Sequence, residues 1–588
     1  MLPLGTVLLH DNRPDGSSLL FEGAREILTT RRKEDALPLL RSIASAQAEG
    51  FHVAGFLSYE LGLLFEERLS PLLPEEVGFP LLWFGIFGEP ARLSQKEAAD
   101  WLDSHAGEEA TLSEVAFSLS REAYGTAFRR LKDYIAAGDV YQVNLTLRQR
   151  FSFSGDPVAL YRRLCRSQPV GHGALIATGE HHILSLSPEL FIERRGDEIR
   201  TRPMKGTAPR GRFPEEDREI AEALLASEKA QAENLMIVDL LRNDLSRIAL
   251  PGSVAVPRLF DTETYRSFHT LTSTVSGRLV PETGLDAILP ALFPCGSVTG
   301  APKIRAMEII KELETGPRWL YCGSIGHVAP DGDFSFNVAI RTATIDRNGR
   351  GEIGTGGGIV ADSDEEAEYR EALLKLRFLE EPGGPFGLIE TLLWDGRQFI
   401  LLDRHLGRLA RSASHFGFVH DSENVRRALD EAVSGRSVPL RVRLVLGEDG
   451  ITTGATPLAP MHGLRFTLAG ERVNSADALL FHKTTRRDFY DRTRAAEAAA
   501  HGVDETVFLN ERGELTEGSF TNLFLRSSGR LLTPALSCGL LPGTLREELL
   551  ATGKVEEAVL TISDLEAAEA IFLGNSVRDL LPATWVRT

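Results

Sequence analysis

The chain has 588 residues and a formal net charge of −18 at pH 7, with a sequence pI of about 5.4. That length predicts more than one domain, and the acidic balance argues against nucleic acid or an anionic membrane surface as a partner. No apolar run reaches membrane-spanning length, and the amino terminus lacks the basic start and cleavage site of a signal peptide. Four scattered cysteines predict reduced thiols in a cytoplasmic protein, without disulfides or a zinc site: Cys165, Cys295, Cys322 and Cys538.

The first elements expected along the chain are an α/β segment over residues 1–110 and a helix over 121–138, which begins after Ser120. Apolar and polar side chains then alternate over residues 142–147, and they alternate again over 336–345. This period of two predicts two strands, each with one face in the core and one polar face. The polar faces are either solvated or part of a binding cleft.

Residues 201–207 read Thr-Arg-Pro-Met-Lys-Gly-Thr and place one lysine, Lys205, in a predicted short turn. Arg202 is close in sequence, and a neighbouring cation makes a lysine easier to deprotonate. Only the neutral amine is a nucleophile. The motif therefore marks Lys205 as a candidate nucleophile, although a solvated surface lysine has the same sequence pattern.

Further along, a glycine-rich stretch at 354–360 precedes a predicted helix with a capping box formed by Ser363 and Glu366. The stretch resembles a phosphate-binding loop, but a tight strand-to-helix turn has the same pattern. Three charged residues fall on one face of that helix, as they would on a solvated surface or in a metal and substrate site. They are Glu368, Glu371 and Lys375.

The clearest domain boundary is the sequence EEPGGP at 380–385, where a charged helix ends in Pro and Gly before a new strand. We predict a linker there, followed by a second domain over residues 386–588. Asp395-Gly396, between two apolar runs, predicts a hairpin near the start of that second domain.

Several segments of the first domain form a specific set. They are YIAAGDVYQVNLT (134–146), SPELF (187–191), EKAQAENLMIVDLLRNDL (228–245), FPCGSVTGAPKIRAMEII (293–310), YCGSIG (321–326), FNVAIRT (336–342) and GTGGGIVADSDEEAEYRE (354–371). In this order they resemble the chorismate-utilising enzymes, the family of anthranilate, aminodeoxychorismate, isochorismate and salicylate synthases. The resemblance covers about residues 118–378. It implies an α/β (α+β) fold, an anthranilate-synthase-like chorismate-binding β-sandwich with helices, over residues 111–379 with 1–110 as its amino-terminal part.

The resemblance also assigns roles to residues. Lys205 matches the lysine of aminodeoxychorismate synthases, where anthranilate synthases carry a small residue, and Glu189 matches the acid that protonates the departing C4 hydroxyl. Gln142 stands where isochorismate and salicylate synthases carry a lysine that activates water, so attack by water is disfavoured. The implied Mg²⁺ ligands are Glu233 and Glu371, with Glu368 close to the metal. The implied substrate-binding residues are Gln142, His269, Thr299, Tyr321, Arg341, Gly357 and Lys375.

The chemistry implied for the first domain is a double displacement. Lys205 attacks C2 of chorismate while the C4 hydroxyl leaves, and ammonia then attacks C4 and expels the lysine. The product would be 4-amino-4-deoxychorismate. No glutaminase motif accompanies any of the four cysteines, so we expect the ammonia to come from a separate glutamine amidotransferase subunit or from free ammonium.

Four segments of the second domain form another set: 386–418, 482–495, 515–524 and 539–550. They resemble the fold-type IV pyridoxal-phosphate enzymes, which include 4-amino-4-deoxychorismate lyase and the branched-chain and D-amino acid aminotransferases. The resemblance implies that Lys483 holds the cofactor and moves a proton, and that Glu517 pairs with the ring nitrogen. The implied phosphate-binding residues are Arg408, Thr544, Leu545 and Ser576.

Because the two domains are fused, we expect a bifunctional enzyme that makes 4-aminobenzoate for folate. The second domain would release pyruvate from 4-amino-4-deoxychorismate, and it is also a candidate homodimer interface. Three alternatives stay open. The second domain is an aminotransferase, or it is a non-catalytic dimerisation module, or the first domain is an anthranilate synthase.

Overall fold

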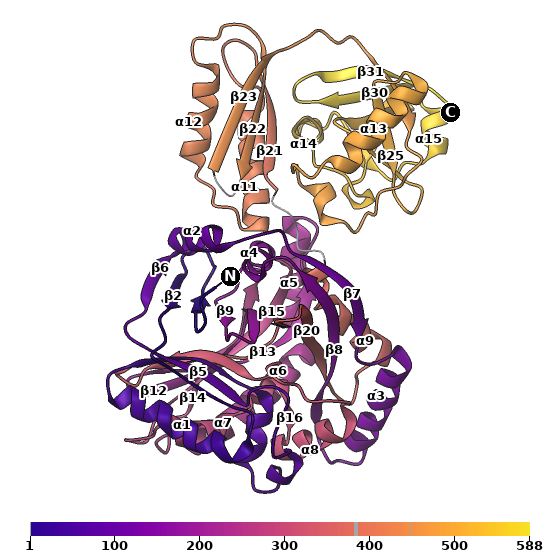
Figure 1. Ribbon diagram of the computed structural model, residues 1–588. Helices are drawn as coiled ribbons and strands as arrows, with labels where there is room; N and C mark the ends of the chain where they lie inside the picture. The colour runs from indigo at the N-terminus through magenta and orange to yellow at the C-terminus, as the bar shows by residue number, and fades with distance from the viewer. Residues whose placement is uncertain (1, 381–385, 448–449, 588) are drawn as a thin grey trace. The chain divides into compact units, whose positions relative to one another are not determined.

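The computed structural model describes residues 2–380, 386–447 and 450–587 (Figure 1). The chain forms two compact units, the first from residues 1–209 and 221–384 and the second from 210–220 and 385–588. The predicted linker at 380–385 lies outside the described residues except for Glu380, which ends a short helix.

One antiparallel sheet of the first unit follows the order β16-β8-β20-β19-β10-β9-β1-β2-β6, and β7 also pairs with β8. It joins strands from the start of the chain to strands more than 300 residues later, so residues 1–110 and residues 111–379 share this sheet. Its strands are β16 (Gly300–Ala301), β8 (Gln142–Ser154), β20 (Arg350–Ile359), β19 (Thr342–Asp346), β10 (His181–Ser187), β9 (His172–Ala177), β1 (Val7–His10), β2 (Ser17–Phe21), β6 (Ala91–Ser94) and β7 (Thr111–Phe117).

A second antiparallel sheet follows the order β13-β15-β12-β11-β18-β17-β4-β5-β3, and β14 also pairs with β15. Its strands are β13 (Met204–Pro209), β15 (Phe268–Arg278), β12 (Glu198–Arg202), β11 (Leu190–Arg195), β18 (Phe334–Asn337), β17 (Ser324–Val328), β4 (His52–Leu57), β5 (Leu82–Phe87), β3 (Glu26–Thr30) and β14 (Ala255–Thr264). Buried side chains of both sheets share one cluster, in which Phe21 and Ile176 of the first sheet meet Phe56 and Phe87 of the second. The two sheets therefore pack face to face, as the predicted β-sandwich requires.

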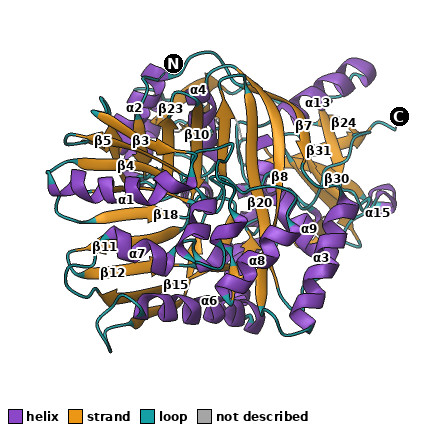
Figure 2. Cartoon of the chain, turned by 60° about the horizontal axis from the view of Figure 1, so that its bottom comes forward, coloured by secondary structure: helices purple, strands orange, loops and turns teal. Residues whose placement is uncertain are grey.

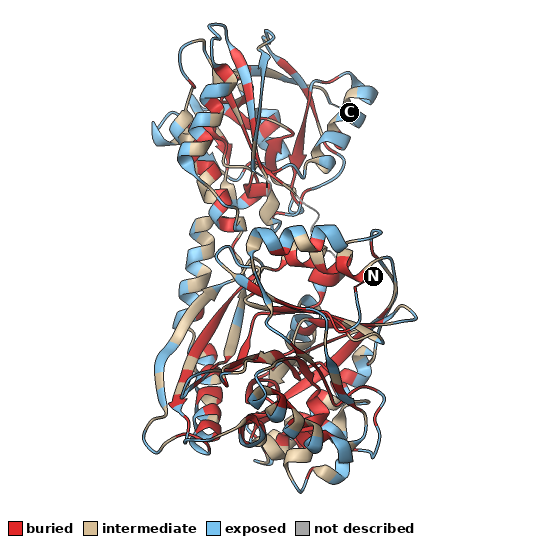
Figure 3. Cartoon of the chain, turned by 60° about the vertical axis from the view of Figure 1, so that its left-hand side comes forward, coloured by how far each residue is buried: buried red, intermediate tan, exposed pale blue. Residues whose placement is uncertain are grey.

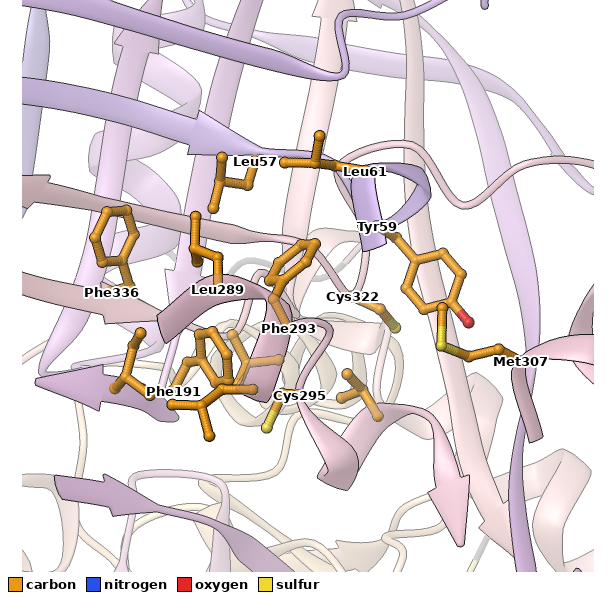
Figure 4. Packing of buried hydrophobic residues seen from close by; sticks show 14 of the residues in the cluster. Leu57, Tyr59, Leu61, Phe191, Leu289, Phe293, Cys295, Met307, Cys322 and Phe336 are labelled. Carbon is orange, nitrogen blue, oxygen red and sulfur yellow. The ribbon is translucent and has the colours of Figure 1, made fainter. Parts of the chain in front are cut away.

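Helices cover the outer faces of this sandwich. In Figure 2, α3, α8 and α9 lie beside β8 and β20, and α6 lies beside β15. The helices are α1 (Lys33–Ala48), α2 (Gln95–His105), α3 (Arg121–Ala136), α4 (Pro157–Ser167), α6 (Glu228–Ser246), α7 (Leu285–Leu292), α8 (Lys303–Leu313), α9 (Glu365–Leu374) and α10 (Arg377–Glu380), and α5 (Pro214–Ala226) has residues in both units. Phe293, which follows α7, packs on Phe191, and Phe336 and Leu289 belong to the same buried cluster (Figure 4).

Three local predictions need correction. The strand predicted over 336–345 is two strands, β18 and β19, because the chain between them bends at Arg341, whose φ of 50° is left-handed. The helix predicted after Ser363 begins one residue later, and the Asp364 carboxylate accepts from the backbone N–H groups of Glu366 and Ala367. Residues 354–359 of the glycine-rich stretch belong to strand β20 and do not form a loop.

The second unit contains two sheets, one of three strands in the order β21-β22-β23 and one of eight in the order β26-β25-β24-β31-β30-β27-β28-β29. The strands are β21 (Leu388–Trp394), β22 (Leu440–Gly447), β23 (Gly450–Pro457), β24 (Leu464–Leu468), β25 (Glu505–Leu509), β26 (Leu515–Gly518), β27 (Asn522–Ser527), β28 (Arg530–Pro534), β29 (Glu556–Ala558), β30 (Ala570–Asn575) and β31 (Asp579–Trp585). The helices are α11 (Leu402–Phe416), α12 (Ser422–Val433), α13 (Asp488–His501), α14 (Thr544–Ala551) and α15 (Ile562–Ala567).

The hairpin predicted at Asp395-Gly396 is only partly present, because a tight turn follows strand β21 but no second strand follows the turn. Gly396 has a φ of 102°, and the chain returns through a single bridge between Trp394 and Phe399 before α11 begins. Buried positions are concentrated on strands such as β4, β9 and β25, whereas the strands β7 and β23 are largely exposed and the helices alternate between buried and exposed residues (Figure 3). Within the described part of the chain no helix is both long and apolar enough to cross a membrane, and all four cysteines are buried free thiols.

Candidate functional site

A cavity of about 330 Å³ opens in the first unit, between strands of both sheets and the helices α6 and α9. Nine of the predicted site residues line it: Glu189, Lys205, Glu233, Tyr321, Arg341, Gly357, Glu368, Glu371 and Lys375. The structure thus gathers at one cavity residues that are up to 186 positions apart in the chain.

Lys205 lies on strand β13, which pairs with β15, and not in the predicted turn. A bulge between Lys205 and Thr207 interrupts this pairing, and Gly206 within it has a φ of 76°. Burial lowers the pKa of the Lys205 amine, although the carboxyls of Glu189 and Glu233 act in the opposite direction. Arg202 forms an ion pair with Glu263, so burial, and not the predicted neighbouring cation, favours the neutral amine.

Glu189 lies in the short connection between β10 and β11, with only 3% of its surface exposed. Burial raises the pKa of its carboxyl to about 7, against the opposing effects of Ser297 and Lys205. The Ser297 hydroxyl donates a hydrogen bond of 2.7 Å to this carboxyl. A carboxyl with this pKa is partly protonated near neutral pH, as a general acid must be. Ser297 was not predicted, although it lies in the same motif as Thr299.

Five consecutive residues of β20, four glycines and Thr355, line one side of the cavity. A Cβ atom at Gly354 would collide with the Tyr321 ring, and one at Gly358 would collide with the Gln142 amide and lie 3.2 Å from Lys205 Nζ. These glycines are therefore required because side chains from other elements pack on the strand, and not because of a turn.

Carboxylates from two helices form one wall of the cavity. Burial raises the pKa of Glu233 on α6 and of Glu368 on α9. Burial alone would also raise the pKa of Glu371, but Lys375 outweighs it and lowers that pKa through an ion pair of 2.9 Å. The described residues contain no cluster of three or more acidic, histidine or cysteine side chains arranged around one point. Carboxylates that leave room for water and substrate are the donor set that suits Mg²⁺.

Arg341 provides a cation on another wall. Its guanidinium lies 4.3 Å from the centre of the Phe268 ring, and burial lowers its pKa to about 10. It hydrogen-bonds to Gln168, and no carboxylate among the described residues pairs with it. A buried guanidinium in this state is suited to bind an anionic ligand.

Three predicted site residues do not line the cavity. Gln142 is 1% exposed, and neither atom of its amide has a hydrogen-bond partner among the described residues, so it remains a candidate for substrate contact. A ring nitrogen of His269 lies 2.9 Å from the Thr264 hydroxyl. The Thr299 hydroxyl donates to the carbonyl of Cys295, which closes the short helix that carries Ser297.

The second unit brings its own predicted residues together around a buried ion network. Glu390 on β21 accepts two hydrogen bonds from Arg408, at 2.9 and 2.7 Å, and one from His405 at 2.6 Å. The other His405 nitrogen reaches Ser576 at 2.9 Å and Thr544 at 3.2 Å. Burial alone would raise the pKa of Glu390, but Arg408 and His405 outweigh it and hold the pKa at about 2. Glu390 and His405 were not predicted.

Lys483 and Glu517 lie close enough to this network for their charges to interact. Burial, together with the charges of Arg487 and Arg408, lowers the pKa of Lys483 to about 7, against the opposing effect of Glu390 and Glu517. Burial raises the pKa of Glu517 to about 8. The Glu517 carboxyl accepts from the backbone N–H of Leu541 at 3.1 Å. A nearby cationic ring nitrogen would favour the ionised form of this carboxyl.

A second buried carboxylate, Glu505, fixes the turn that follows Glu517. It is fully buried and accepts from the backbone N–H groups of Ser519 and Phe520 at 2.9 and 3.1 Å. The hydroxyls of Ser519 and Thr521 donate to it as well. An Asp-Glu pair before a strand gave no sequence signal of this role, because the donors lie more than ten residues later.

These residues fit a pyridoxal-phosphate site. A buried lysine with a lowered pKa, a buried carboxyl, and a cluster of Arg408, Thr544 and Ser576 supply the amine, the ring-nitrogen partner and the phosphate donors that the cofactor requires. Thr544 and Leu545 begin α14, so their backbone N–H groups are available to a phosphate. The carboxylate of Glu390 offsets part of the positive charge.

Known proteins resemble both units. The sequence pattern of the family described as chorismate binding enzyme matches residues 6–381, and that of amino-transferase class IV matches residues 387–586. Aminodeoxychorismate synthase component 1 of Salmonella typhimurium is 40% identical over 345 residues, which are 56% of this chain and 76% of that protein. Anthranilate synthase component 1 of Thermus thermophilus is 39% identical over 354 residues, again 56% of this chain and 76% of that protein.

A solved structure supports the fold of the first unit. Anthranilate synthase component I from Streptococcus pneumoniae superimposes with a TM-score of 0.55 at 27% identity, over 62% of this chain and 92% of that one. The predicted anthranilate-synthase-like fold is thereby confirmed for the first unit, and the class IV match confirms the predicted fold type of the second.

Proposed function

We propose, because this chain belongs to the family of chorismate binding enzymes, that its first unit aminates chorismate at C4 to give 4-amino-4-deoxychorismate. The observation that carries this proposal is a half-buried lysine, Lys205, at the same cavity as the buried acid Glu189. Sequence identity does not decide between the two activities, since the aminodeoxychorismate and anthranilate synthases are 40% and 39% identical to this chain.

In the proposed reaction, the neutral Lys205 amine forms a bond to C2 of chorismate as both ring double bonds shift and the C4–O bond breaks. Glu189 gives its proton to the departing hydroxyl, which leaves as water. Ammonia then bonds to C4, the bond from C2 to Lys205 breaks, and the surplus proton on the new amine returns to Glu189. Burial supports both steps, because it favours the neutral amine and the protonated acid.

The other cavity residues would bind and orient the substrate. Arg341 and Tyr321 would hold one carboxylate of chorismate, and the amide of Gln142 would face the reacting ring, where a base for water is absent. Mg²⁺ would be held by Glu233 and Glu371, with Glu368 near it, and would supply positive charge for the other carboxylate.

The second unit is proposed to convert this product into 4-aminobenzoate and pyruvate. Pyridoxal phosphate, when bound, supplies an electron sink. The residues that would hold it are Lys483, Glu517, Arg408, Thr544, Leu545 and Ser576. Lys483 would move the proton at C4 of the substrate, since its pKa of about 7 lets it accept and release a proton near neutral pH. Aromatisation of the ring then drives the release of pyruvate.

An aminotransferase is the second candidate for this unit, because its matching family is described as amino-transferase class IV. Ammonia for the first unit would come from a glutamine amidotransferase, since the aminodeoxychorismate synthase relatives are named component 1, which indicates a second component. We place the enzyme in the cytoplasm and in the synthesis of 4-aminobenzoate for folate.

Product identification tests these proposals. The purified chain is incubated with chorismate, ammonium, Mg²⁺ and pyridoxal phosphate, and the products are separated by chromatography. We expect 4-aminobenzoate and an equal amount of pyruvate. 2-Aminobenzoate as the product would contradict C4 amination, and amino transfer between amino acids and 2-oxo acids without 4-aminobenzoate would contradict the lyase.

A further inference from the structure

One arginine beside Lys483 has no role in the proposed function. Arg487 precedes helix α13, four residues after Lys483, and its guanidinium donates a hydrogen bond to the backbone carbonyl of Ser519. Ser519 belongs to the turn that follows Glu517. Arg487 is therefore held between the segment that carries the proposed cofactor lysine and the segment that carries the proposed ring-nitrogen partner.

Arg487 is half-buried and forms no ion pair with any described residue. Its guanidinium carbon lies 5.5 Å from the centre of the Tyr490 ring, which forms an apolar platform beneath it. No carboxylate in the described ranges forms an ion pair with Arg487, whereas Arg404, Arg408 and Arg411 of the same unit each pair with a glutamate. A guanidinium that is partly desolvated and unpaired is suited to bind a carboxylate in a bidentate manner.

The Tyr490 side chain beneath Arg487 carries a second polar group that a ligand could bind. The Tyr490 hydroxyl is buried close to the Glu517 carboxyl, but it forms no regular hydrogen bond within the described segments. Burial, and then the nearby Glu517 carboxylate, raises the pKa of this hydroxyl, so it remains a hydrogen-bond donor. A buried donor without a partner destabilises the fold unless a ligand satisfies it.

The charges around Lys483 also call for an anion in addition to the cofactor phosphate. Arg487 makes the largest charge contribution that lowers the pKa of Lys483, and it acts in the same direction on Arg443 of strand β22, where Asp491 is the opposing acid. Arg408 already lies in the cluster proposed for the phosphate. Arg487 is a cation near Lys483 that the phosphate would not use, and it also lowers the pKa of the nearby Glu517 carboxyl.

We propose that Arg487, seated on the Tyr490 ring, binds a carboxylate of the substrate of the second unit, with the Tyr490 hydroxyl as a second donor. The proposal rests on the function proposed for this unit, in which the substrate is an amine that carries carboxylates. It assigns the orientation of that substrate, because the carboxylate would lie at Arg487 while the amine lies at Lys483.

A matched pair of ligands and a matched pair of variants test this role. The ligands are 4-aminobenzoate and the uncharged 4-aminobenzamide, and the variants of the full chain are Arg487→Gln and Arg486→Gln. Arg486 is the adjacent arginine, but it is exposed and lies over the Phe386 ring at 4.9 Å. The dissociation constant of each ligand is measured from the visible absorbance of the bound cofactor, which reports on the second unit alone.

We expect the wild-type protein and Arg486→Gln to prefer the carboxylate over the amide by about tenfold or more, and Arg487→Gln to lose that preference. Tyr490→Phe should weaken carboxylate binding by about threefold. The KM for 4-amino-4-deoxychorismate should rise in Arg487→Gln by more than kcat falls, with the cofactor absorbance unchanged. Arg487→Lys keeps the charge and should retain part of the preference, which serves as the test if the Gln variant does not fold.

Preservation of the carboxylate preference in Arg487→Gln, or an undiminished preference in Arg487→Lys with the cofactor absorbance intact, would overturn the proposal and leave Arg487 as a support of the Ser519 turn. Failure of the proposed lyase activity is a separate result. Wild-type protein that does not act on 4-amino-4-deoxychorismate would contradict the lyase, but the ligand pair would still measure the carboxylate site.

Discussion

The two sites of this enzyme use the same pair of groups in opposite electrostatic surroundings. Each places a lysine whose pKa is lowered by burial near a carboxyl whose pKa is raised by burial, Lys205 with Glu189 and Lys483 with Glu517. The surplus charge around each pair differs in sign. Several carboxylates surround the first pair and several arginines surround the second, so the first site suits a metal cation and the second an anionic phosphate and carboxylate.

The largest effect is expected from removal of the lysine of the second site. Lys483→Ala should halt the release of 4-aminobenzoate and pyruvate, with a loss of at least about a thousandfold, because no other group would hold the cofactor or move the proton. Chorismate should still be consumed, so 4-amino-4-deoxychorismate should accumulate. Chromatography of both compounds over time checks this, and formation of 4-aminobenzoate at the wild-type rate would contradict the assigned role.

The next largest effect is expected from removal of the carboxylates proposed to bind Mg²⁺ at the first site. Glu233→Ala and Glu371→Ala should each reduce chorismate amination by about a hundredfold or more, because the metal would lose a ligand. The conversion of supplied 4-amino-4-deoxychorismate should continue, since the metal serves the first site alone. Glu366→Ala is the matched control, because Glu366 lies on the same helix α9 but pairs with Arg121 on the surface. Equal loss of both activities in a folded variant would contradict the separation of the sites.

A smaller effect is expected when the hydrogen bond to the Glu189 carboxyl is removed. The Ser297 hydroxyl stabilises the ionised carboxyl, so Ser297→Ala should raise the pKa of Glu189 above its value of about 7. A general acid acts while it is protonated, and activity should therefore persist to higher pH. We expect the alkaline limb of kcat/KM for amination to move up by roughly half to one pH unit, with less than a tenfold change in rate. A shift of that limb to lower pH would contradict this role.

The smallest effect on catalysis is expected from Glu505, whose role is positional. Glu505→Gln should destabilise the second unit by about 1–3 kcal/mol, because an amide NH₂ would face donors that now bond to a carboxylate. Thermal unfolding followed by cofactor absorbance should show a lower midpoint, while chorismate consumption stays unchanged. Glu471→Gln, at an exposed pair with Arg492, is the control. An unchanged midpoint in Glu505→Gln would show that the turn holds without this carboxylate.

The sequence motifs predicted which residues gather at one cavity better than they predicted local structure. Helix α3 and its cap at Ser120 were predicted correctly from local pattern, because capping is decided within one turn. Lys205 was placed in a turn and its activation assigned to Arg202, but the strand pairing of β13 and the burial of Lys205 depend on segments distant in sequence. Such long-range contacts leave no local signal.

The same limit explains which site residues were missed. Glu390 and His405 pair across two elements of the second unit, and Ser297 reaches Glu189 over more than 100 residues of chain. The glycines of β20 carried a signal, but their spacing fits both a loop and a crowded strand, and only the side chains of Tyr321 and Gln142 decide between them.

Replacement of Lys205 tests the central claim most directly, because the assignment of C4 amination depends on this residue. Wild-type protein and Lys205→Ala are given chorismate, ammonium and Mg²⁺, and the amino products are identified by mass spectrometry and by comparison with both aminobenzoates. We expect the variant to lose the C4-aminated product by at least about a hundredfold, with any residual amination at C2. Formation of 4-aminobenzoate by Lys205→Ala at the wild-type rate would contradict the account.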